Sequence, residues 1–167
     1  LSEGGSIGEI DIHGIYGAPH TLTVKAVGGE HGAGIGGGWA SSTMTYREKP
    51  KVESITIYGP ADIDASSKHH GTGIGGGCRG FAGAITIGKP GDPGKLTVKA
   101  SGGDEGAGIG AGWDGRMTSV TINGGTILAN AGTKGAGIGS GYQAQGGDIV
   151  INGGDITAKG STNSSGI

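Results

Sequence analysis

The sequence has little of what usually braces a compact core. Its 167 residues include one cysteine, five prolines and seven aromatic residues (two Trp, four Tyr, one Phe). A single cysteine, Cys78, excludes a disulfide within the chain, and so few aromatic rings leave only a thin core of Ile, Val, Leu and Ala. No apolar run approaches the ~20 residues of a membrane-spanning helix. The net charge of −2 argues against nucleic acid as a partner.

Glycine, in contrast, is abundant, and its positions repeat. The chain has 43 glycines, several times the usual share. The octet Gly-Ala-Gly-Ile-Gly-Gly-Gly-Trp at 32–39 returns with small changes at 71–78, 106–113 and 135–142, and the chain ends inside a fifth copy at Ser165-Gly166-Ile167. A disordered or collagen-like tract has no reason to keep one isoleucine per repeat. Self-similarity at this period indicates a stacked repeat architecture.

Two short segments of alternating apolar residues precede each octet. The first occurs at 9–12, 54–57, 84–87, 119–122 and 148–151. The second occurs at 22–26, 63–67, 96–100, 127–131 and 156–160. Alternation with period two among β-branched residues is typical of half-buried strands. In the second segment the alternation predicts one outward column that holds Lys25, Lys99 and Lys159.

Three β segments per repeat, joined by Gly- and Asn-rich turns, predict one coil of a parallel β-helix. We therefore expect an all-β, right-handed solenoid that forms a single segment over 1–167, with a loop at Ala40–Glu53. The expected coils, of 29–39 residues, run at about 1–49, 50–83, 84–117, 118–146 and 147–167. Because the chain opens on Leu1 and ends within a repeat, we expect it to be part of a longer protein whose further coils cover Ile167.

The repeat unit Ser119–Gly132, followed by the octet at 135–142, resembles glycine-rich repeat proteins of Gram-positive bacteria. Those proteins are typically large and secreted or attached to the cell wall. The resemblance implies an extracellular or cell-surface location and a role in adhesion or display. In architecture alone the chain is similar to the pectate-lyase-like β-helices, which implies a polysaccharide-degrading enzyme as a third possibility.

Aromatic residues end three of the octets and suggest a ligand surface. Trp39, Trp113 and Tyr142 share this position, and Cys78 occupies it in the second octet. If the octet isoleucines point inward, alternate glycines would form an outward strip without side chains: Gly34, Gly36, Gly75 and Gly110. A sugar ring could stack on the aromatic rings beside that strip, which predicts a non-catalytic module that binds glycans of a host or cell-wall surface. The alternative is a ladder of half-buried rings in a structural stalk.

Polar residues stand immediately before each octet and suggest a metal site. In aligned coils, His31, His70 and Glu105 would stack ~4.8 Å apart, with Asp104 in the neighbouring column. Imidazole and carboxylate groups at that spacing could share a transition-metal ion, and carboxylates with turn carbonyls could hold calcium. The alternative is a solvated polar corner, and no other cofactor is expected.

Signals for catalysis are weak. Cys78 could pair with His69 or His70, but a nucleophile also needs a pocket with an oxyanion donor, and Cys78 only replaces an aromatic residue in a repeat. The G-x-G-x-x-G pattern at 71–76 recurs in other repeats and has no helix after it, as a dinucleotide site requires. We therefore expect no enzymatic activity and no nucleotide site.

Overall fold

The computed structural model describes residues 6–45, 48–92 and 95–167. Within these ranges all regular structure is β-strand, which confirms the all-β prediction. None of the described residues belongs to a helix that could cross a membrane. Of the expected loop at Ala40–Glu53, Tyr46 and Arg47 lie outside the described residues, and a strand already begins at Lys51.

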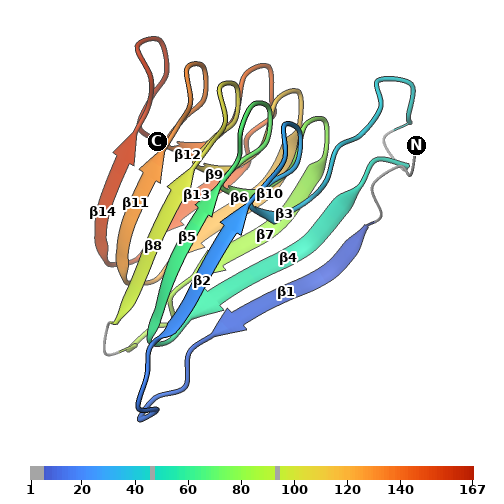
Figure 1. Cartoon of the computed structure of the whole chain (residues 1–167). Helices are drawn as coiled ribbons and strands as arrows, with labels where there is room; N and C mark the ends of the chain where they lie inside the picture. The colour runs from blue at the N-terminus through green and yellow to red at the C-terminus, as the bar shows by residue number, and fades with distance from the viewer. Residues whose placement is uncertain (1–5, 46–47, 93–94) are drawn as a thin grey trace.

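The strands form three parallel sheets (Figure 1). The first two sheets take one strand from each of the five coils, and the third takes one strand from each of the first four. The first sheet contains β1 (Ile7–His13), β4 (Lys51–Tyr58), β7 (Phe81–Ile87), β10 (Arg116–Ile122) and β13 (Asp148–Ile151). The second contains β2 (Leu22–Val27), β5 (Ala61–Ser66), β8 (Leu96–Ser101), β11 (Thr126–Asn130) and β14 (Asp155–Lys159). The third contains β3 (Ile35–Gly36), β6 (Ile74–Gly75), β9 (Ile109–Gly110) and β12 (Ile138–Gly139). This topology is a parallel β-helix.

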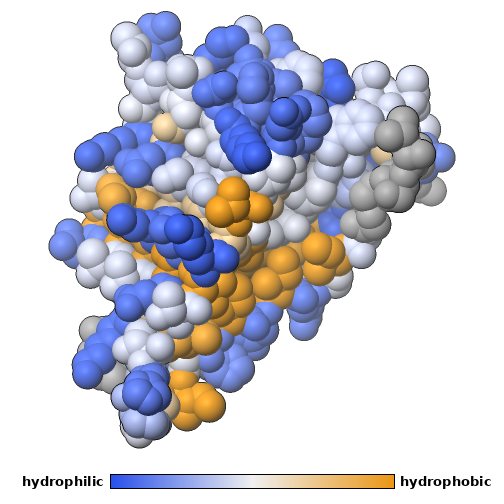
Figure 2. Space-filling model, in the orientation of Figure 1, coloured by the Kyte–Doolittle hydropathy of each residue, from blue (hydrophilic) through white to orange (hydrophobic). Residues whose placement is uncertain are grey.

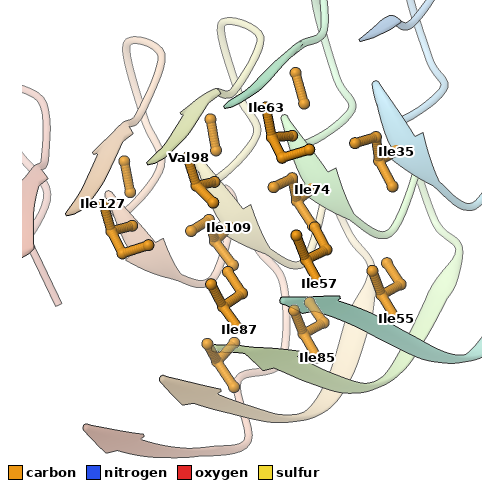
Figure 3. Packing of buried hydrophobic residues seen from close by; sticks show 14 of the residues in the cluster. Ile35, Ile55, Ile57, Ile63, Ile74, Ile85, Ile87, Val98, Ile109 and Ile127 are labelled. Carbon is orange, nitrogen blue, oxygen red and sulfur yellow. The ribbon is translucent and has the colours of Figure 1, made fainter. Parts of the chain in front are cut away.

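The core is a set of aliphatic columns that run along the rod axis. Isoleucines and valines of all three sheets point into the space between the sheets (Figure 3). The third sheet supplies Ile35, Ile74, Ile109 and Ile138, one from each octet. The second sheet has an alanine column, Ala65, Ala100 and Ala129, that is fully buried. Small side chains there let the second and third sheets approach closely.

The second sheet differs from the predicted register. The repeat pattern placed Ile63 at the level of Leu22, but the structure pairs Leu22 with Ala61 and Val24 with Ile63. A shift of two residues keeps every side chain on the same face, so alternation alone could not detect it. The predicted lysine column is therefore partly wrong. Lys25 and Lys99 flank Asp64, whereas Lys159 lies opposite Asn130 in another column.

The two end coils expose apolar side chains, including Ile7, Leu22 and Ile151 in columns whose middle-coil members are buried. At one end Ile7, Leu22 and Val27 are exposed, and Figure 2 shows an apolar band over the region of β1 and β2. At the other end Val150, Ile151 and Ile167 are exposed. The incomplete fifth octet is nevertheless stacked in place, because the amide of Ile138 donates to the carbonyl of Gly166 at 2.9 Å.

Candidate functional site

The polar residues before the octets form the predicted column. The amide of His70 donates to the Glu30 carbonyl at 2.7 Å, and the amide of Glu105 donates to the His69 carbonyl at 2.9 Å. The same bond, from Lys134 to the Asp104 carbonyl at 2.9 Å, adds a fourth level. The residues His31, His70, Glu105 and Lys134 therefore occupy equivalent positions of successive coils, and we call them the corner column.

Side chains of the corner column contact one another at every level. The Nδ1 atoms of His31 and His70 lie 2.9 Å apart, at hydrogen-bond distance. Nε2 of His70 lies 3.2 Å from Oε2 of Glu105, and Nζ of Lys134 donates to Oε1 of Glu105 at 2.7 Å. The His70 and Glu105 side chains are each only 17% exposed, so these contacts are partly shielded from water.

Asp104, predicted to share the metal site, has a different neighbour. Its Oδ2 lies 3.5 Å from Nε2 of His69, and both side chains are about half exposed. In the part of the chain that the structure describes, the group of side chains close enough to share an ion consists of His31, His70 and Cys78. Glu105 lies beside that group, against the far side of the His70 ring.

Cys78 was not predicted as a metal ligand, although it completes this group. It is fully buried, and its Sγ, one imidazole nitrogen of His31 and one of His70 all lie within 4.8 Å of one another. The octet bends back on itself, and the amide of Cys78 donates to the His31 carbonyl of the preceding coil at 2.7 Å. The same bond joins Trp113 to His70 at 2.9 Å and Tyr142 to Glu105 at 2.8 Å. Each octet thus ends beside the corner column.

Burial shifts the pKa values of two members of this group, His70 and Cys78. Desolvation, helped by the neighbouring His69 and His31, lowers the pKa of His70 below its usual value. Desolvation also raises the pKa of the Cys78 thiol to about 11. The hydrogen bond from Lys134 lowers the pKa of the Glu105 carboxyl. A raised thiol pKa disfavours the free thiolate that a Cys/His nucleophile would need.

The aromatic residues after the octets pack against the corner column. Trp39 and Trp113 are half-buried. The Trp113 ring lies 4.9 Å from the His70 ring and 4.4 Å from the Arg79 guanidinium carbon. Tyr142 is 40% exposed, and Nζ of Lys134 lies 4.5 Å from its ring centre. Protein groups therefore already contact the Trp113 and Tyr142 rings that were predicted to receive sugars.

The predicted outward glycine strip is wrong. Gly75 and Gly110 are buried, and Gly34 and Gly36 are only partly exposed. Gly75 has a φ of +134°, and a Cβ atom on it would lie 2.0 Å from the carbonyl oxygen of Gly110 in the next coil. The missing side chains would thus point along the rod axis into the neighbouring backbone. These glycines permit close stacking of coils and do not form an outward strip free of side chains.

Comparison with protein families supports the repeat architecture. The sequence matches the family model of the β-helix repeat at residues 23–39, 55–78, 97–113, 120–142 and 149–167, which together make up more than half of the chain. No curated protein and no solved structure matched the sequence. The narrower resemblance to surface proteins of Gram-positive bacteria stays a prediction. With its repeated strands and octets, the chain belongs to the β-helix repeat family.

Proposed function

We propose that this chain is a structural segment of a longer solenoid, which acts as a stalk in a secreted or surface-attached protein. The apolar columns of the end coils carry this proposal. Ile10 and Val24 at one end, and Ile149 and Ile156 at the other, are only half-buried. Their counterparts in the middle coils, such as Ile55 and Ile63, are almost fully buried. Further coils stacked on both ends would continue these columns.

Stacking is also the favourable state for such ends. Complete burial of an Ile or Leu side chain stabilises a fold by roughly 1.5–3 kcal/mol. In a solenoid these contributions add up coil by coil, since each coil contacts only its neighbours. The strand edges of β1 and β13 would also gain hydrogen-bonded partners, instead of remaining free to pair with other chains. A coil of the same kind fits both the apolar columns and the strand edges.

An added coil tests the stalk proposal directly. A second copy of residues 139–167, attached after Ile167, continues the fifth octet in register. We expect a higher Tm, a single unfolding transition, and a rod longer by ~4.8 Å in small-angle scattering. The matched control carries Ile149→Asp and Ile156→Asp in the added copy only. An unchanged Tm, or a separate transition for the added copy, would reject the proposal.

Glycan binding is a second candidate function, which the exposure of Tyr142 favours. Tyr142 is 40% exposed, and Trp113 and Trp39 at the equivalent positions of other coils are half-buried. In this proposal the segment is a non-catalytic adhesion module, and the ring edges and the nearby polar groups contact sugars of a host or cell-wall surface. A glycan array compares the wild type with Tyr142→Ala. Binding that Tyr142→Ala abolishes supports this candidate; binding to no glycan, or equal binding by both proteins, rejects it.

A further inference from the structure

We propose that His31, His70 and Cys78 form a binding site for a zinc-like transition-metal ion on the corner of the rod. Two imidazole nitrogens and one thiolate would hold the ion, and the fourth position would take water or an external ligand. The three side chains come from two adjacent coils. His31 precedes the first octet, whereas His70 precedes the second octet and Cys78 ends it. This site is independent of whether the segment acts as a stalk.

The distances suit such an ion. Zinc lies 2.0–2.1 Å from histidine nitrogen and about 2.3 Å from cysteine sulfur, so neighbouring ligand atoms of a tetrahedral site are about 3.3–3.6 Å apart. Here the two Nδ1 atoms are 2.9 Å apart, and Sγ of Cys78 lies within 4.8 Å of one nitrogen of each imidazole ring. Side-chain rotations that move these atoms by about 1 Å would bring the group to tetrahedral spacing.

Glu105 and Lys134 orient His70 for this role. Histidine ligands of zinc commonly donate their second ring N–H to a carboxylate, which fixes the tautomer. Nε2 of His70 lies 3.2 Å from Glu105, and Lys134 holds that carboxylate at 2.7 Å. A proton on Nε2 leaves the lone pair of Nδ1 free to face His31, whose Nδ1 lies 2.9 Å away. Glu105 and Lys134 thus supply the outer contacts that histidine ligands of a metal site commonly have.

The backbone fixes the ligands before any ion arrives. The amide of Cys78 donates a hydrogen bond to the His31 carbonyl, and the amide of His70 donates one to the Glu30 carbonyl. Trp113 packs against His70 on one side, and Trp39 lies 6.1 Å from His31 on the other. Such preorganisation reduces the entropy that ion binding would otherwise cost.

The donor set selects the class of metal. Thiolate and imidazole ligands suit zinc, copper(I) and related ions, whereas calcium requires six to eight oxygen ligands. Charges of both signs surround the group, because Arg79 and Lys49 lie near Cys78 together with Glu105 and Asp114. The acidic pair therefore offsets the cations. The site favours a transition metal over the calcium that the sequence also allowed.

Metal binding requires one proton to leave the protein. The divalent ion replaces the proton of the Cys78 thiol, which passes to solvent as the metal–sulfur bond forms. In the metal-free state one of the facing Nδ1 atoms donates to the other. If Nε2 of His70 keeps its proton, the donor is His31, whose proton moves to its own Nε2 through solvent. The ligands are then one thiolate and two neutral imidazoles, as zinc sites require.

Cobalt(II), a spectroscopic substitute for zinc, tests the site in the whole chain. We expect one cobalt ion per chain and a thiolate-to-cobalt charge-transfer band in the near ultraviolet, which zinc abolishes by displacement. Zinc should also raise the Tm, because it binds only the folded state. Cys78→Ser should lose the band and the Tm increase. His69→Asn, one residue from His70 but outside the group, should keep both.

Two further observations separate a metal site from a structural cluster. Glu105→Gln should keep the band but weaken zinc affinity by about tenfold, since it alters only the orientation of His70. Each variant is first melted in chelator, so that a loss of folding is distinguished from a loss of binding. The cobalt spectrum of the wild-type protein tests thiolate ligation even if every variant fails to fold. A cobalt spectrum without the thiolate band, or a zinc-induced Tm increase that survives Cys78→Ser, would overturn the proposal.

Discussion

Two columns of the same rod differ in how their residues change from coil to coil. The octet column places isoleucine at every level, in Ile35, Ile74, Ile109 and Ile138, and all four are buried. The corner column places a different residue at almost every level, in His31, His70, Glu105 and Lys134, and joins them by polar contacts. Both columns have the same backbone spacing. Their chemistry differs because the octet column faces the apolar interior, whereas the corner column is partly exposed to solvent.

This difference distinguishes positions that maintain the repeat fold from positions that carry chemistry particular to a few coils. Identical residues along a column indicate a position where each coil needs the same packing volume. Residues that change along a column, yet contact one another, indicate a feature of particular coils. Cys78 belongs to the second kind, since it replaces Trp39 and Trp113 at one level only. The proposed metal ligands therefore come from two coils, and Glu105 and Lys134 of the next two coils support them.

The largest expected effect follows from a break in the interior column. Ile74→Asp would bury a carboxylate among Ile35, Ile109 and the facing sheets, without a partner. An uncompensated buried charge destabilises a protein by about 3–5 kcal/mol, so thermal melts should show a large fall in Tm or no folded protein. The control is Ala84→Asp, which places the same carboxylate on the exposed face of β7. Equal melts for the two variants would contradict the assignment of inside and outside.

A smaller but still large effect is expected at the octet glycines. Gly75→Ala forces a side chain into a φ of +134° and against the Gly110 carbonyl. Strain of this kind costs on the order of 1–3 kcal/mol, before any displacement of the neighbouring coil. Gly32→Ala is the matched control, because a Cβ atom there meets nothing within 4 Å. Chemical denaturation should therefore separate these two substitutions within the repeated octets.

These two positions show what the sequence could and could not predict. Inward isoleucines such as Ile74 were predictable, because alternation and the repeat period both place them in the core. The direction of Gly75 was not, because a glycine at positive φ breaks the alternation that was assumed for the octet. The proposed ligand Cys78 was missed for a related reason. Its closeness to His31 depends on how the octet bends back, and a count of residues along the chain does not reveal that bend.

A third prediction concerns the outward face of the second sheet. Asp64 lies between Lys25 and Lys99 in the register that the structure gives, so the three charges alternate. Asp64→Lys would place three like charges in one column ~4.8 Å apart and should lower stability by up to about 1 kcal/mol. Asp64→Asn, the control, should have a smaller effect. Added salt should remove most of the difference between the variants; a difference that does not change with salt would contradict an electrostatic cause.

The smallest expected effect on stability concerns Tyr16 and Asp92, which form a contact between coils that the described residues of the other coils do not repeat. The hydroxyl of Tyr16 donates to the Asp92 carboxylate, which raises the pKa of Tyr16 from 10.0 to about 12. Because the folded state holds this proton more tightly than the unfolded state, the contact stabilises the fold fully below pH 10, and this stabilisation is lost as pH rises through about 12. In an absorbance titration of the phenolates, Asp92→Asn should move one tyrosine to lower pH, and Tyr16→Phe should remove that step. Since both groups lie outside the core, neither substitution should change the Tm at neutral pH appreciably. A large fall in Tm would show that this non-repeated contact supports the rod as the interior columns do.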